Sequence, residues 1–274
     1  PDTVVCTGGT PVGARPRCSP LGSGLDPTDE VFAQPLDRLQ CTGEDSTAEG
    51  GTVVEYNWTL VARPPGSSAR PSPETAETTS VFLDAAGNYE LSLNIVDNRG
   101  CVSEPASVHA IARSDDDIML QLTWRTPADP DETDAGAGAG ADIDLHLLHP
   151  NGCWEDRTWD CHFRAANPNW GDVARADDDP SVDIDDTDGA GPEVISLNNP
   201  ESGLTYLVGV NYWDDHGFGR SDATLRVYVF GELVFEQTRT LTASGQWWVP
   251  ASVAWPSGGV VPVDVVSDGV PVCD

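Results

Sequence analysis

Residues 89–97, YELSLNIVD, indicate the fold class, because apolar and polar side chains alternate along them. This period of two places every second side chain on the same face and is typical of a half-buried β-strand. The segments 52–61 (TVVEYNWTLV) and 106–112 (ASVHAIA) repeat the alternation. Clusters of Gly, Pro, Asn and Asp separate such segments, and helical periodicity is almost absent. The sequence therefore predicts an all-β protein.

The charged segment RSDDDI (113–118) lies between two complete sets of predicted strands and marks a domain boundary. This division predicts two β-rich domains in tandem; the fold class of two tandem β-sandwiches, Ig-like or jelly-roll-like, is what family resemblances of the two domains imply. The division has four parts: a disulfide-stapled leader at 1–31, a first β-sandwich at 32–113, a second β-sandwich with acidic loops at 114–258, and a C-terminal tail at 259–274.

The charge of the chain excludes several classes of partner. Its 45 acidic and 14 basic residues give a formal net charge of -31, which repels nucleic acid and anionic membrane surfaces. No apolar stretch is long enough for a transmembrane helix, so we expect no membrane insertion. The chain starts at Pro1 without Met and holds seven cysteines, which together predict a mature, exported bacterial protein of the extracellular space or cell surface.

The spacing of the cysteines predicts two local disulfides. Cys153 and Cys161 flank the short segment WEDRTWD, and Cys6 and Cys18 lie together in the Gly/Pro-rich leader. Cys273 is then left over, and a free thiol, a bridge to another chain or a different pairing all stay open. No pair of cysteines has the spacing of a structural zinc site.

The first predicted domain resembles a PKD domain, an Ig-like β-sandwich of bacterial surface proteins. The resemblance covers roughly residues 32–113 and is carried by the acidic loop before EYNW, the strand AGNYELSLNIVD, and the Gly-containing turn before SEPASV. It implies that Trp58 lies in the core and that Tyr89 is a structural strand residue. It also implies that Cys41 and Cys101 lie close enough to form a disulfide.

The second predicted domain is similar to the YfaP-like family of bacterial exported domains of unknown function. The matching motifs follow one another as ADIDLHLLHPNG, Cys153, DIDDTDGAGPEVISL and GLTYLVGVNYW, over roughly residues 117–256. The similarity implies a β-sandwich outside the cytoplasm and assigns no catalytic residues. It leaves metal binding open.

Acidic residues in this second domain predict a composite calcium site. Alternation along ADIDLHLL places Asp142 and Asp144 on the face opposite the core, about 7 Å apart. The loop at 179–193 adds many carboxylates and two glycines, an oxygen-rich set that suits calcium. With Gly189 at the required glycine position, isoleucines fall at the first and last ligand positions of an EF-hand, so the loop alone is not a calcium motif. The predicted ligands are Asp142, Asp144, Asp183, Asp186, Asp188 and Asp214.

Two other interpretations of these residues stay open. The aspartates could instead cap turns and solvate a loop. His146 and His216 could join aspartates in a transition-metal site.

The motifs predict a non-catalytic role in adhesion, surface display or assembly, with other surface proteins or glycans as partners. No nucleophile elbow, HExxH helix or phosphate loop is present, and carboxylate pairs arise by chance in so acidic a chain. One alternative is a carbohydrate-binding module in which Trp154, Trp159 and Trp170 stack on a sugar, unless these residues pack the core. The other is a subunit of a surface filament or layer, joined through terminal segments and Cys273.

Overall fold

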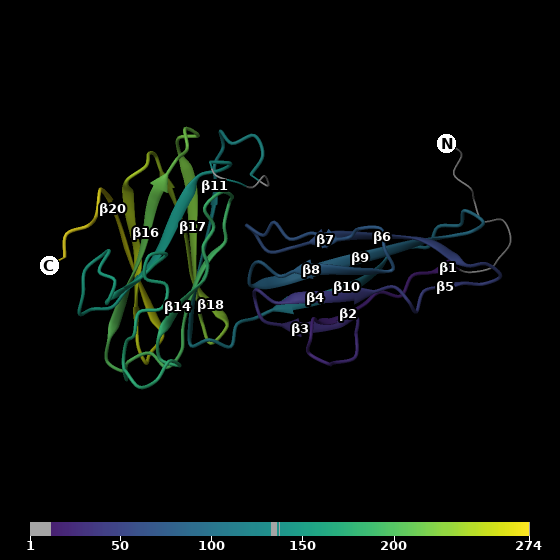
Figure 1. Cartoon of the computed structure of the whole chain (residues 1–274), viewed down its shortest axis with the longest axis horizontal. Helices are drawn as coiled ribbons and strands as arrows, with labels where there is room; N and C mark the ends of the chain where they lie inside the picture. The colour runs from purple at the N-terminus through teal and green to yellow at the C-terminus, as the bar shows by residue number, and fades with distance from the viewer. Residues whose placement is uncertain (1–11, 133–135, 137, 274) are drawn as a thin grey trace. The chain divides into compact units, whose positions relative to one another are not determined.

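The computed structural model describes residues 12–132, 136 and 138–273 and divides the chain into two compact units between Arg113 and Ser114. None of the described residues is helical, and no segment among them has the length and hydrophobicity of a membrane-spanning helix. Each unit contains two main β-sheets around an apolar core (Figure 1). The predicted fold class, two tandem β-sandwiches, is confirmed.

The first unit has one sheet in the order β3-β10-β9-β6, one in the order β2-β4-β8-β7, and a small β1-β5 pair. Only β3 and β10 pair in parallel; the other named strand pairs of this unit are antiparallel. The strands are β1 (Val12–Gly13), β2 (Arg17–Pro20), β3 (Glu30–Ala33), β4 (Arg38–Thr42), β5 (Thr47–Ala48), β6 (Val53–Ala62), β7 (Pro71–Ser72), β8 (Thr78–Phe82), β9 (Gly87–Asp97) and β10 (Ala106–Ala112).

The apolar side chains of YELSLNIVD lie in the core of this unit, because β9 is a central strand and one of its faces points inward. Tyr89, Leu91, Leu93 and Ile95 are all buried and belong to one apolar cluster. Trp58 on the neighbouring β6 lies in the same cluster. The Tyr89 hydroxyl donates to the Ala85 carbonyl at 2.8 Å and accepts the Ala85 N–H at 2.9 Å, so its buried polar atom is satisfied.

The second unit pairs the sheet β14-β15-β11-β17-β18 with the sheet β13-β12-β16-β19-β20, and all its named pairs are antiparallel. Its strands are β11 (Ile118–Arg125), β12 (Asp142–Leu148), β13 (Asp160–Cys161), β14 (Pro180–Ile184), β15 (Glu193–Leu197), β16 (Thr205–Asp214), β17 (Ser221–Val229), β18 (Glu232–Leu241), β19 (Gln246–Ala254) and β20 (Gly259–Asp268).

Two segments expected to lie outside the sandwiches contribute strands to them. In the predicted leader, β2 pairs with β4 of the first unit. In the predicted C-terminal tail, β20 pairs with β19 along most of its length. β20 joins the sandwich because valines alternate along it, and this alternation directs Val260 and Val266 against the core of the second unit.

The cysteine pairing in the first unit differs from the prediction. Cys18 on β2 lies directly opposite Cys41 on β4, and the two form a disulfide. The predicted bonds Cys41–Cys101 and Cys6–Cys18 are therefore wrong, because the antiparallel β2–β4 register gives each of Cys18 and Cys41 the other as its partner. Cys101 is disulfide-bonded, though not to Cys41, and Cys6 lies outside the described residues.

The predicted Cys153–Cys161 bond is also wrong. Cys161 on β13 points into the core and is a buried free thiol, whereas Cys153 lies exposed in the preceding loop. Cys153 instead bonds Cys273, 120 residues further along the chain. Short spacing misleads here because β13 turns the Cys161 side chain away from the loop.

We expect the Cys153–Cys273 bond to stabilise the second unit substantially. Cross-linking residues so far apart restricts the unfolded chain strongly, so Cys153→Ser should lower the free energy of unfolding by about 2–4 kcal/mol. Urea unfolding followed by tryptophan fluorescence measures this, since eight of the nine Trp lie in this unit. Cys273→Ser and the double variant should lose the same amount, because each removes the same bond. Additive losses in the double variant would contradict this assignment.

Candidate metal centre

Three loops of the second unit meet where β12 begins and β16 ends. The loop after β11 contacts the loop after β14, since the Gly136 N–H donates to Asp188 Oδ2 at 2.5 Å. The loop after β16 reaches the same place, with His216 Nδ1 2.6 Å from the Gly140 carbonyl. Segments distant in sequence therefore bring their carboxylates to one end of the sandwich.

Strand β12 supplies the innermost carboxylates of this end. Ile143, Leu145 and Leu147 face the core, as the alternation predicts, and the intervening side chains lie on the opposite face of the sheet. This second face is also covered: Asp142 is 8% exposed and Asp144 only 2%. Two aspartates on one strand face are thus largely removed from water.

Asp144, Asp185 and Glu193 form a compact acidic triad. Each offers a carboxylate oxygen, and these atoms all lie within 4.8 Å of one another. Glu193 comes from β15 in the other sheet and is 3% exposed. Its Oε2 accepts the Leu145 backbone N–H at 2.5 Å, which links β15 to β12. Asp185, directly after β14, is the exposed member of the triad.

The triad and Asp142 carry buried oxygens with no hydrogen-bond donor. Asp142 Oδ1, Asp144 Oδ2 and Glu193 Oε1 are all buried and unpartnered in the described structure. A buried, unsatisfied carboxylate oxygen is costly, and most such groups in native proteins have a partner, an ordered water or an ion. A cation held by the triad would supply the missing partner for Asp144 and Glu193, since the triad's carboxylate oxygens lie within 4.8 Å of one another.

Electrostatics at the site also favours a cation. Burial, together with the charges of Asp142 and Asp185, raises the pKa of Asp144 to about 8. Burial and the neighbouring Asp185 raise the pKa of Asp142 to about 7. Burial and Asp144 raise the pKa of Glu193 well above its ordinary value. These carboxylates resist ionisation because they repel one another in a poorly solvated place.

The six predicted ligands have different positions. Asp144 belongs to the triad, and Asp142 acts on it electrostatically. Asp186 and Asp214 bond within their own loops: Asp186 Oδ2 accepts the Gly191 N–H at 2.7 Å, and Asp214 Oδ1 accepts the His216 N–H at 2.9 Å. Asp188 accepts the Gly136 N–H, as described above. Asp183 is exposed on β14 and lies outside the triad.

Two members of the triad, Asp185 and Glu193, were not among the predicted ligands. A signal for Glu193 does exist in the sequence EVISL, where alternation places it on the same face as Ile195 and Leu197. Those two side chains are in the core, so the carboxylate occupies an inward-facing position. Asp185 carries no comparable signal, because several aspartates compete within the same loop.

The histidines do not join this group in the described part of the chain. His146 Nδ1 lies 2.8 Å from Asp160 Oδ2, and its ring stacks on His162 with centroids 4.8 Å apart. His216 bonds the Gly140 carbonyl. The side chains that lie together therefore form an all-oxygen site and not a mixed His/Asp site.

The tryptophans proposed for sugar stacking are packed rather than displayed. Trp154 is 7% exposed and contacts His146 and Trp247, while Trp170 is 2% exposed and stacks on Tyr206. Trp159 is half-buried against the core cluster. The prediction of an exposed platform at these three residues is wrong, because the loop that carries them folds over the sandwich and contributes to its packing.

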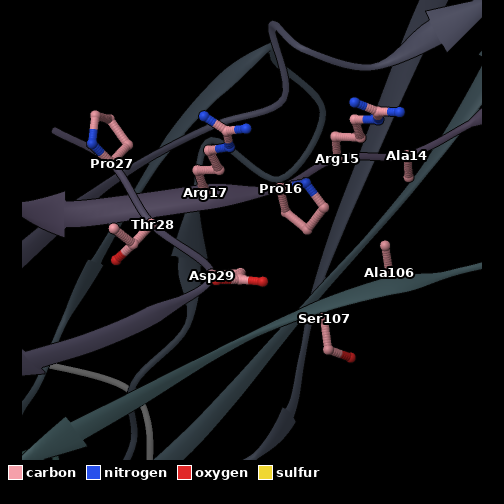
Figure 2. A pocket seen from close by; sticks show the side chains of 9 residues that line it. All are labelled: Ala14, Arg15, Pro16, Arg17, Pro27, Thr28, Asp29, Ala106 and Ser107. Atoms are coloured by element: carbon pink, nitrogen blue, oxygen red, sulfur yellow. The ribbon is translucent and has the colours of Figure 1, made fainter.

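The first unit has a surface cavity of about 420 Å³ lined by both polar and apolar side chains. Figure 2 shows Arg15 and Arg17 on one side of it, and Asp29 and Ser107 on the other. Arg17 pairs with Asp45 at 3.2 Å and Ser107 donates to a Glu90 oxygen at 2.7 Å, so the side chains of Arg17 and Ser107 already have partners. The mixed charges and engaged groups define no ligand, unlike the unpartnered oxygens of the acidic triad.

Comparison with known proteins assigns no family to the chain. No protein-family model matches the chain, and no curated protein matches it. Among solved structures, similarity is found to the PKD domain from KIAA 1837 protein, at 22% identity over 30% of this chain and 76% of that one, with a TM-score of 0.26. The D00-D0 domain of intimin is 8% identical over 84% and 99% of the two chains, with a TM-score of 0.24. The chicken CNTN1 FN1-FN3 domains are 11% identical over 85% and 93%, with a TM-score of 0.21. Because these identities and TM-scores are low, the function has to be inferred from the site itself.

Proposed function

We propose that this chain is an exported, non-catalytic surface protein whose second β-sandwich binds one calcium ion, and that it acts in adhesion or assembly. Asp144, Asp185 and Glu193 are the proposed ligands, with Asp142 as a fourth. The observation that carries the proposal is that Asp144, Asp185 and Glu193 bring carboxylate oxygens within 4.8 Å of one another, while Asp144 Oδ2 and Glu193 Oε1 are buried and unpartnered.

The donor set favours calcium over other metals. All four side chains offer carboxylate oxygens, the ligands preferred by hard cations, and the group contains neither His nor Cys. The carboxylates come from two strands in different sheets and from a loop, so their arrangement is irregular. Calcium accepts six to eight oxygens in flexible geometry, whereas magnesium requires a near-ideal octahedron.

A cation at this position would act mainly on structure. It would join β12 to β15 and to the loop after β14, and would neutralise carboxylates that otherwise repel. The disulfides Cys18–Cys41 and Cys153–Cys273 support an oxidising location such as the cell exterior. An acidic chain with two β-sandwiches, one of which has a calcium-stabilised end, suits display and adhesion outside the cell.

Isothermal titration calorimetry on the full chain, after metal removal with EDTA, tests this proposal. We expect one calcium ion per chain and at least tenfold weaker binding of magnesium. Zinc should not compete at equal concentration, since nitrogen and sulfur donors are missing from the site. Absence of calcium heat, together with no calcium in elemental analysis of protein purified in calcium, would overturn the proposal.

A further inference from the structure

Trp213 is the one tryptophan with a substantially exposed side chain, at 41%, and all nine tryptophans are described. It stands near the end of β16, beside Asp214, whose backbone pairs with Asp142. Asn211 lies opposite Asp144 in the same ladder, and Trp213 lies at the bulge between Tyr212, opposite Ile143, and Asp214, opposite Asp142. The exposed indole therefore stands beside the part of β12 that carries Asp142 and Asp144.

Arg164 connects Trp213 to the triad electrostatically. Its guanidinium carbon lies 4.5 Å from the Trp213 ring centroid and 4.8 Å from that of Phe163. The same charge partly offsets the elevation of the pKa of Asp144. The guanidinium thus lies over two neighbouring aromatic rings, whose centroids are 5.6 Å apart, and its N–H groups can still donate hydrogen bonds.

The triad itself is accessible from one side. Asp144 and Glu193 are buried, whereas Asp185 is exposed, so a cation would be bound from the protein interior and open toward solvent at Asp185. Three or four carboxylates do not fill a calcium coordination sphere. Oxygen atoms of a ligand could take the remaining positions.

We propose that this end of the second unit binds a neutral saccharide. Two adjacent sugar hydroxyls would coordinate the calcium ion, the sugar ring would pack on the exposed part of Trp213, and Arg164 would donate to further hydroxyls. This inference rests on the proposed calcium site. The binding surface is distinct from the buried residues Trp154 and Trp170.

The net charge of the site favours a neutral saccharide over an acidic one. Asp142, Asp144, Asp185 and Glu193 contribute four negative charges when a metal holds them ionised. Calcium and Arg164 together supply three positive charges, so the site stays negative within a chain of net charge -31. A uronic acid or sulfated sugar would be repelled, whereas hydroxyl oxygens bind calcium without adding charge.

The test is a glycan array carrying neutral and acidic glycans, probed with the full chain in calcium and again in EGTA. We expect retention of neutral glycans in calcium, loss in EGTA, and at least a tenfold lower signal for Trp213→Ala. Phe230→Ala is the matched control, because Phe230 is also an exposed aromatic residue (55%) but lies far from the site. It follows the last residue of β17, whereas the loop from β16 enters β17 at its first residue, Ser221. This variant should bind like the parent protein.

Calorimetry separates this inference from the proposed function. Trp213→Ala should bind calcium as the parent does, because it removes no carboxylate. Calcium binding without glycan retention, or glycan retention that Trp213→Ala leaves unchanged, would overturn the saccharide site alone. Retention of acidic glycans only would also overturn it. Absence of calcium binding to the parent protein would overturn the calcium site and the saccharide site built on it.

Discussion

Asp144→Asn should abolish the calcium-dependent rise in melting temperature. In the parent protein, calcium at about 100 times its dissociation constant should stabilise the folded state by about 2.7 kcal/mol. For a unit of this size, that corresponds to a rise of roughly 5–10 °C. The variant loses a central ligand, so its melting temperatures in calcium and in EDTA should coincide. Differential scanning calorimetry on the full chain measures both.

The matched control for this variant is Asp183→Asn. Asp183 belongs to the acidic segment near the site but lies outside the triad, on the exposed side of β14. It should keep the full calcium response. A calcium response lost in Asp183→Asn and kept in Asp144→Asn would show that the metal binds elsewhere in the acidic segment.

Metal-free protein should lose stability as the pH rises from 6.5 to 8.5. The folded-state pKa values of Asp142 and Asp144, about 7 and about 8, exceed the ordinary value near 4, so the folded state holds protons that the unfolded state has released. Raising the pH removes these protons and exposes the repulsion, at a cost of about 1–3 kcal/mol over this interval. Urea unfolding in EDTA at several pH values measures the slope.

Calcium and the Asp142→Asn/Asp144→Asn double variant supply the controls for this pH dependence. Both should flatten the slope, because calcium keeps the carboxylates ionised and the amides do not titrate. Below pH 6.5 a second group acts in the opposite direction: burial, and then the nearby His146, lower the pKa of His162 to about 4. Protonation of His162 destabilises the folded state there. An equal slope in the double variant would exclude the aspartates as its origin.

The fold was predictable because its main signal is local. Alternation in YELSLNIVD and ADIDLHLL assigns each side chain to a face, and the buried residues of β9 and β12 follow it. Strand pairing is not local, and this limits what spacing reveals about cysteines. Cys18 meets Cys41 through the β2–β4 register, and Cys153 meets Cys273 only after β20 has joined the sheet.

The site was predictable in part for the same reason. Asp142 and Asp144 share a strand face, which sequence alone establishes. Glu193 joins them only because β15 lies in the other sheet and directs its first side chain to β12, a contact between distant segments. The choice of Asp185 over Asp183, Asp186 or Asp188 depends on where β14 ends and how the loop turns. Those details follow from tertiary packing.

The Cys153–Cys273 bond also changes how the second unit would carry a mechanical load. A pull on the backbone at Cys273 passes through the covalent bond to the loop before β13, and not through the β19–β20 hydrogen bonds. Strands β13 to β20 all lie between the two cysteines and are shielded from the force while the bond is intact. At roughly 3.5 Å per extended residue, the 120-residue separation keeps about 400 Å of chain from being drawn out. Reduction of this one bond would turn a short tether into a long one.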